Sequence, residues 1–130
     1  MEDLDNLKDV VLIAFGAILG ANIRFLIYQK LEKINLSNHH IILLINTFSS
    51  FLFGLFLSFS SQMDSFTYPY KLGLFFLIGL LGSLSTFSAF ISDLYNLFIQ
   101  LEFYRALRLF IISLTLGILS FAAGFLIRNA

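Results

Sequence analysis

The sequence contains no cysteine, no tryptophan and a single proline, and it is poor in charged residues. Without cysteine the chain can form neither a disulfide framework nor a thiolate-ligated metal site. Charged residues make up 12% of the 130 residues, about half the share that is usual in soluble domains. The eight basic residues are balanced by eight acidic ones, so the chain has no basic excess of the kind that nucleic-acid binding requires.

Hydrophobic residues are abundant instead, at 58% of the chain. A soluble domain of this size cannot bury that much apolar surface, so the composition indicates an integral membrane protein. Spanning segments must satisfy their backbone hydrogen bonds internally, and the long apolar runs therefore predict an all-α fold in contact with lipid. The N-terminal stretch "MEDLDNLKDV" is acidic, unlike a signal peptide, and we expect the first apolar segment to stay as a span.

Four apolar segments are long enough to cross a bilayer, which needs roughly 20 residues per helix. They cover about residues 10–28, 41–60, 72–99 and 106–127, and the third is longer than a single crossing requires. The connections are too short to fold by themselves, so we expect one four-span membrane domain over residues 1–130. Any function must then lie within the spans.

Lysine and arginine near the span ends give only a small bias in membrane orientation. Topology follows the side that holds more of these residues, and acidic residues count little. The two sides hold Lys8, Lys71 and Arg128 against Lys30, Lys33, Arg105 and Arg108, with Arg24 near the second group. This difference favours an N-terminus outside the cell, but it also permits insertion in both orientations or pairing with an oppositely inserted partner.

Small and polar residues share one face of the first span. Gly16 and Gly20 form a GxxxG pair, which allows two helix backbones to approach closely. Arg24 continues the same stripe. An arginine at this depth either extends to the lipid headgroups or faces a wet cavity.

The second and fourth spans carry amide and hydroxyl groups at helical spacing. Asn46, Ser49 and Ser50 fall on one face of the second span, and Ser113 belongs to a stripe of small residues in the fourth. Such residues either bond neighbouring helices together or line a polar pathway. Helix packing explains the serines, whereas the NH2 group of Asn46 is suited to donate to an anion.

The most unusual part of the sequence is "GLLGSLSTFSAF", within the third span. Poor helix formers are concentrated between Gly82 and Thr86, which predicts a helix break. Broken backbone at membrane depth is tolerated where protein buries it or where it lines a cavity, and its free carbonyls can ligate a small cation. Phe87 and Phe90 follow, three residues apart, and their ring edges carry a positive potential that suits a small anion.

The ionisable residues give no sign of an enzyme. Asp93 is the one carboxylate that can lie within a span; at the interface it would instead be capped or paired with Arg105 or Arg108. His39 and His40 are adjacent in a predicted loop, and neighbouring side chains that point in different directions make a poor metal clamp. No glycine-rich phosphate loop lies beside a lysine. We therefore interpret the chain as a non-enzyme.

Three stretches, "GAILGANIRF", "INTFSSFLFG" and "GLLGSLSTFSAFISD", resemble the Fluc/CrcB family of fluoride channels. They occur in this order across the first three spans, and the fourth span matches more weakly. The resemblance implies an antiparallel, dual-topology dimer with two narrow fluoride pathways and a central structural sodium ion. The backbone carbonyls of Gly82 and Ser85 in both subunits would hold this sodium.

The resemblance also implies roles for individual side chains. The fluoride pathway would be lined by Asn46, Phe87, Ser88, Phe90 and Ser113, with Arg24 at the vestibule and Asp93 as the acidic residue that follows the motif. The chain departs from the family where Ile42 and Leu109 stand in place of a common threonine and a common tyrosine.

Together these features predict passive, selective export of fluoride across a bacterial plasma membrane, which would relieve fluoride toxicity. The channel would be a homodimer or a heterodimer with a related four-span subunit. One alternative is a small proton-coupled multidrug exporter, but that needs a membrane carboxylate, and the first span has none between Val10 and Tyr28. The other is a non-conducting assembly subunit, whose small-residue stripes would serve for packing only.

Overall fold

The computed structural model describes residues 1–60 and 67–129, which form helices with no β-strand among them. In chain order these are α1 (Glu2–Glu32), α2 (Asn38–Ser60), α3 (Thr67–Gly73), the π-helix η1 (Leu74–Leu81), α4 (Gly82–Leu84), α5 (Phe87–Ile99) and α6 (Phe103–Asn129). Four helical stretches among them are long and apolar enough to cross a membrane, the third being the run from Tyr70 to Ile99. The predicted all-α membrane fold is thus confirmed.

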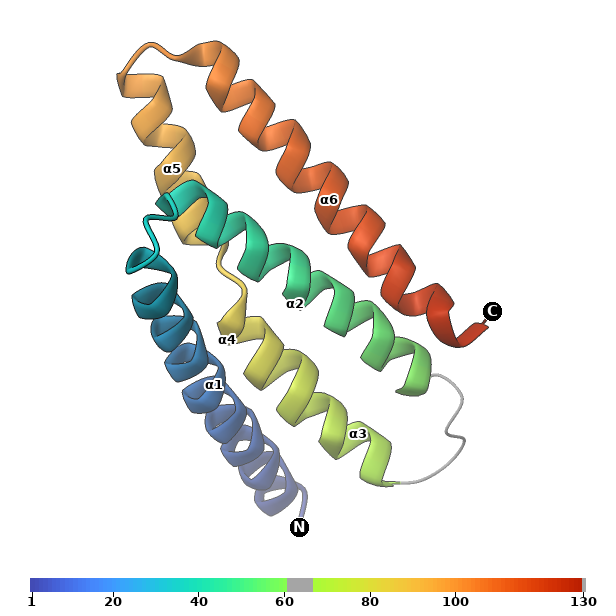
Figure 1. Cartoon of the computed structure of the whole chain (residues 1–130). Helices are drawn as coiled ribbons and strands as arrows, with labels where there is room; N and C mark the ends of the chain where they lie inside the picture. The colour runs from blue at the N-terminus through green and yellow to red at the C-terminus, as the bar shows by residue number, and fades with distance from the viewer. Residues whose placement is uncertain (61–66, 130) are drawn as a thin grey trace.

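The helices are arranged as two pairs with little contact between the pairs (Figure 1). α1 packs along η1 and α4, and α2 packs along α6 for most of its length. α5 lies beyond the interruption of the third span and contacts α6 and α2. The interruption therefore carries the chain from one helix pair to the other.

Glycines allow the helices of each pair to approach closely. In the α2–α6 pair, a Cβ atom at Gly54 would overlap the Phe121 carbonyl, and one at Gly124 would overlap the Phe51 carbonyl. In the other pair, a Cβ at Gly79 would lie 2.6 Å from the Ile13 carbonyl oxygen, closer than real Cβ atoms come. Both pairs are thus held by direct backbone-to-backbone contact, as small-residue stripes in membranes allow.

A small apolar core joins α2 to the third span. Its buried members are Ile41 and Ile45 of α2, Leu81 of η1 and Leu84 of α4. Side chains from the end of α1, among them Ile27 and Leu31, pack against this core. The core therefore lies beside the interruption and fixes its position relative to α2.

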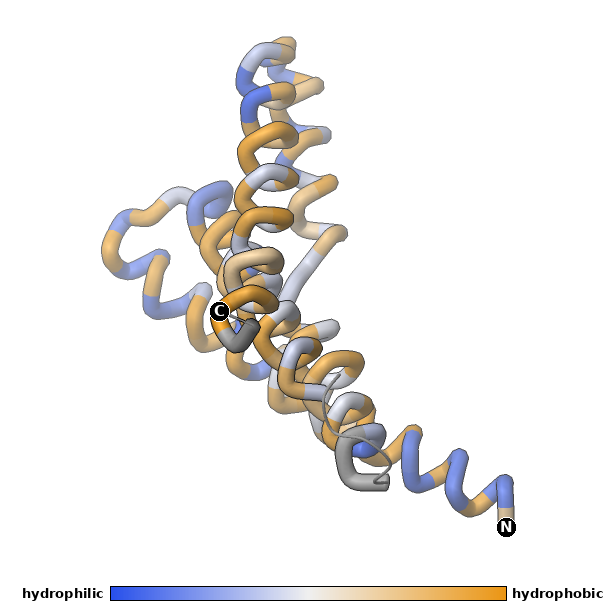
Figure 2. Tube along the Cα trace, turned by 90° about the vertical axis from the view of Figure 1, so that its right-hand side faces the viewer, coloured by the Kyte–Doolittle hydropathy of each residue, from blue (hydrophilic) through white to orange (hydrophobic). Residues whose placement is uncertain are grey.

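Most of the remaining apolar surface is exposed, above all on α1 and α6. Figure 2 shows hydrophobic residues along the helices and hydrophilic ones gathered towards their ends. α1 begins at Glu2, before the predicted start of the first span near residue 10, and its first turn holds Glu2, Asp3 and Asp5. Acidic side chains are favourable at the positive end of the helix dipole, which explains why the helix extends past the apolar stretch.

The break predicted between Gly82 and Thr86 is present but shorter than expected. Helical geometry continues through Gly82 to Leu84, and only Ser85 (ψ 146°) and Thr86 (φ −137°, ψ 112°) are extended. The π-helix η1 leads directly into α4 on the N-terminal side of the break. Wider helical turns of this kind are common at functional sites.

The prediction that the two histidines lie in a loop is wrong. α2 begins at Asn38, so His39 and His40 occupy its first turn, and the His40 N–H donates to the Ser37 carbonyl at 3.0 Å. The polar pair Ser37–Asn38 is a helix-start signal that precedes the apolar run. The helix extends past the apolar segment because polar residues at a membrane surface can continue it without entering lipid.

We expect Gly124→Ala to destabilise the protein by about 1–3 kcal/mol, the usual effect of overpacking, because its methyl group would overlap the Phe51 carbonyl across the pair. The measurement is thermal unfolding in detergent. Gly117→Ala on the same helix is the matched control, since its Cβ would lie 3.8 Å from the Ser50 hydroxyl, an ordinary contact. Equal melting temperatures for the two variants would contradict the close α2–α6 packing.

Candidate functional site

The interruption of the third span is held open by one side chain from α2. The Asn46 amide oxygen accepts the Thr86 N–H at 2.9 Å, and the Asn46 NH2 donates to the Thr86 carbonyl at 3.3 Å. These two bonds satisfy both backbone groups of an extended residue that is 8% exposed. Since an unpaired backbone group is costly in lipid, this pairing is what makes the break tolerable at membrane depth.

Thr86 also begins the next helix. Its hydroxyl oxygen accepts the Ala89 N–H at 3.1 Å, which is a helix N-cap. The extended backbone at Ser85 and Thr86 re-aims the chain, and α5 therefore starts at Phe87 in a new direction (Figure 1). The cap fixes the first turn of α5, which carries Phe87 and Phe90.

The same bonds leave two backbone carbonyls without their helical donors. In a continuous helix the Thr86 N–H would donate to the Gly82 carbonyl and the Ala89 N–H to the Ser85 carbonyl. Here Asn46 takes the first N–H and the Thr86 hydroxyl takes the second. Gly82 and Ser85 are therefore suited to offer hard oxygen atoms to a cation.

An open groove of about 320 Å³ lies where α2, the break, α5 and α6 meet. Its lining mixes amide and hydroxyl groups with aromatic rings. Five of the residues predicted for the anion pathway or the cation site are in it: Asn46, Ser85, Phe87, Phe90 and Ser113. Residues distant in the sequence thus form one surface, here called the aromatic groove.

Three phenylalanine rings lie next to one another along the aromatic groove. The ring centroids of Phe87 and Phe90 are 6.2 Å apart, and those of Phe90 and Phe110 are 6.3 Å apart. Phe110, from α6, was not anticipated from the sequence, although it lies three residues before Ser113 and so on the same helical face. Phe87 is 75% exposed, so the described part of the chain supplies no opposite wall at this end of the groove.

A smaller cavity of about 110 Å³ continues along α2 beyond the aromatic groove. Ser50 and Ser85 line both cavities. Ser49 lines the smaller one, and its buried hydroxyl has no hydrogen-bond partner among the described residues. Hydroxyl groups therefore extend the polar lining past the break.

A third pocket, of about 260 Å³, lies at the other end of the aromatic groove, between the N-terminal ends of α2 and α6. Its polar lining comes from four side chains that can be cationic, His39, His40, Arg105 and Arg108. Its remaining lining residues are apolar. We call it the basic pocket.

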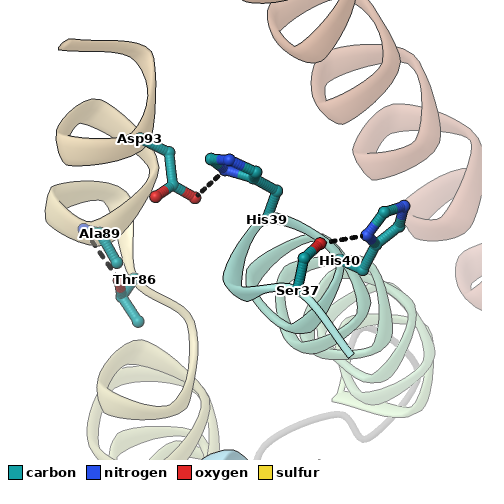
Figure 3. A network of polar contacts seen from close by, with 6 residues as sticks. All are labelled: Ser37, His39, His40, Thr86, Ala89 and Asp93. Carbon is teal, nitrogen blue, oxygen red and sulfur yellow. Dashed lines mark hydrogen bonds and ion pairs between the residues drawn. The ribbon is translucent and has the colours of Figure 1, made fainter. Parts of the chain in front are cut away.

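Asp93 lies on α5 beside the basic pocket and is buried. Its carboxylate pairs with the Nδ1 atom of His39 at 3.0 Å (Figure 3). The predicted pairing of Asp93 with Arg105 or Arg108 is wrong, because Arg105 instead binds Glu102 at 2.9 Å within its own helix turn. Once α2 begins at Asn38, His39 is the partner that reaches Asp93.

Comparison with known proteins gives a consistent result. The chain matches the family described as CrcB-like protein, Camphor Resistance (CrcB), over residues 11–125. A relative from Prochlorococcus marinus strain NATL2A, named fluoride-specific ion channel FluC 2, is 57% identical over 118 residues, which are 91% of this chain and 95% of the relative. A FluC 1 protein of Parasynechococcus marenigrum is 32% identical over 90% of each chain. This chain belongs to the CrcB family.

Two of the residues that the family resemblance singled out lie away from the aromatic groove of this CrcB chain. Ser88 is exposed on α5. Arg24 is half-buried on α1, which belongs to the helix pair that does not line the groove. Within a single chain neither side chain contributes to the groove. Their predicted roles, like those of the groove residues, stay predictions.

We expect Asn46→Ala to expose the break. Loss of the amide leaves the Thr86 N–H and carbonyl unpaired, at about 1–3 kcal/mol per buried group. Hydrogen exchange followed by mass spectrometry should show faster exchange in peptides that span residues 85–89.

The control for this measurement is Asn22→Ala, which removes only a bond from Asn22 to the Ile18 carbonyl within α1. Exchange across residues 85–89 should be unchanged in that variant. Wild-type protection in Asn46→Ala would show that the break does not depend on this side chain.

Proposed function

We propose that the chain forms a fluoride-selective channel that exports fluoride passively across a bacterial plasma membrane. The observation that carries the proposal is the aromatic groove, in which an amide, hydroxyls and phenylalanine rings surround one space within the membrane-spanning part. The names of the CrcB-family relatives support it, since they are fluoride-specific ion channels. A channel performs no covalent chemistry, and the chain is accordingly not an enzyme.

The groove offers a dehydrated fluoride ion replacement contacts. Removing water from a small anion is costly unless other donors take its place. Asn46 uses one N–H on Thr86 and keeps a second, and the hydroxyls of Ser113 and Ser50 can also donate. The edges of Phe87 and Phe90 add positive potential without fixed charge, so the ion is stabilised but not trapped.

Selectivity against chloride follows from size. A larger anion needs a wider passage, and the rings of Phe87, Phe90 and Phe110 would form one apolar wall of it. Chloride also gains less from small, hard donors than fluoride does. The groove thus favours the ion that is small enough to be contacted by several donors at once.

The channel would consist of two chains in antiparallel orientation, with a sodium ion at their centre. The exposed Phe87 and the incomplete groove need a second wall, and a second copy or a related four-span chain can supply it. The relatives include proteins numbered FluC 1 and FluC 2, which fits either arrangement. The carbonyls of Gly82 and Ser85, freed at the break, would hold the sodium from both subunits as a structural ion.

A proton-coupled exporter fits the structure less well. Such a carrier needs a membrane carboxylate free to exchange protons for substrate. Asp93 is the only buried charged residue among those described, and its carboxylate is paired with His39. α1 offers no acid between Val10 and Tyr28.

The first test is fluoride efflux from proteoliposomes, followed with a fluoride electrode. We expect efflux from the chain alone or with a co-expressed related chain, and no chloride efflux. Phe87→Ile should lower the rate at least tenfold, which is a rise of about 1.4 kcal/mol in the barrier, with the dimer intact on size exclusion.

Phe98→Ile is the matched control for that substitution. Phe98 is also an exposed phenylalanine on α5, but its ring contacts Phe103 outside the groove. It should conduct at the wild-type rate. Absence of fluoride efflux from both the chain alone and the pair would overturn the proposed function.

The sodium proposal has a separate test. Purification with a large organic cation in place of sodium should lower the melting temperature and loosen the dimer, because the freed carbonyls then face each other without a counter-charge. Readdition of sodium should restore the melting temperature and the dimer, more fully at higher sodium concentrations. Identical stability in the two cations would contradict a structural sodium site.

A further inference from the structure

The aromatic groove and the basic pocket follow one another along the same three helices. On α2 the basic pocket is lined by His39 and the groove by Asn46, two turns further on. On α6 the corresponding residues are Leu109 and Ser113, one turn apart. An anion that enters through the basic pocket therefore reaches the groove along the seam between these helices.

Asp93 lies between the two sites. On α5, Phe90 lines the groove one turn before Asp93, and Leu97 lines the basic pocket one turn after it. The carboxylate is 12% exposed, so water screens its charge only weakly. A negative charge held at this point would repel an anion that moves from pocket to groove.

His39 controls the net charge at this point. Its Nδ1 atom lies 3.0 Å from the Asp93 carboxylate and connects the first turn of α2 to α5 (Figure 3). With a neutral imidazole the pair has a net charge of minus one, whereas a protonated imidazole makes the pair neutral. Histidine is the side chain whose charge ordinarily changes between about pH 5 and 8.

Other charged groups around the pair do not take over this role. Arg105 is bound to Glu102, and His40 is hydrogen-bonded to Ser37 (Figure 3). Arg108 lines the basic pocket and makes no ion pair among the described residues, so it attracts anions to the pocket whatever the state of His39.

The remaining neighbours come from α1. The Tyr28 hydroxyl lies within electrostatic range of Asp93, and of Arg24 and Glu32 in its own helix. A phenol is neutral throughout the range in which histidine titrates. Tyr28 therefore adds no charge change over this range.

We propose that protonated His39 neutralises Asp93 and thereby opens the route from the basic pocket to the aromatic groove, so that fluoride flux rises as the pH falls. The proposal rests on the proposed function and adds a regulation to it. His39 acts on the ion through Asp93 and is a positioning and charge-setting residue. A cell exposed to acid takes up more fluoride as the neutral acid, so the flux would increase where export is needed.

The test is the pH dependence of fluoride efflux at equal pH on both sides of the membrane, at about pH 5.5 and about pH 8. Leakage of the neutral acid is measured in protein-free vesicles and subtracted. We expect the wild type to conduct roughly three- to tenfold faster at the lower pH, because the repelling charge is then cancelled.

Three variants distinguish an effect of charge on the fluoride flux from an effect of altered structure. His39→Gln should conduct slowly at both pH values, because the carboxylate stays charged. His39→Arg, with a permanent positive charge, should conduct fast at both. Asp93→Asn should also conduct fast and without pH dependence. His40→Gln tests the second histidine of the basic pocket. Loss of the pH ratio in this variant, with the ratio kept in His39→Gln, would overturn the role of His39.

The outcomes distinguish this proposal from the proposed function. A wild-type pH ratio in His39→Gln, or equal slowing in His39→Gln and His39→Arg, would overturn the role of His39 while the channel function stands. No efflux from the wild type at either pH would overturn the channel function itself. Size exclusion of each variant confirms that the same assembly is compared.

Discussion

The structure depends on the two hydrogen bonds between the Asn46 side chain and the Thr86 backbone. A lipid environment tolerates an interrupted helix only where the freed backbone groups find partners. Asn46 supplies them from a different helix, with a donor and an acceptor in one planar group. The change in direction between α4 and α5, the free carbonyls before the break and the placement of the phenylalanines after it all follow from this pairing.

The glycine contacts have a second effect beyond packing. Because α2 and α6 meet backbone to backbone at Gly54 and Gly124, their distance is set at that end of the pair. The basic pocket and the aromatic groove lie towards the N-terminal ends of the same two helices.

Periodicity and composition in the sequence were enough to predict the four apolar helices, the break and the shared face of Phe87 and Phe90. These are local properties, encoded within one turn or one span. The partners of Asn46 and Asp93 could not be predicted, because they join residues 40 and 54 positions apart. The start of α2 was misplaced for a related reason: apolar content marks where a span crosses lipid, whereas capping marks where a helix begins.

The exposure of Phe87 has a consequence for how such a protein is made. A single chain newly inserted into the membrane presents a groove with one side open to lipid. An ion on that side would meet lipid instead of a polar wall. In the two-chain arrangement proposed above, neither half would therefore conduct before it meets the other.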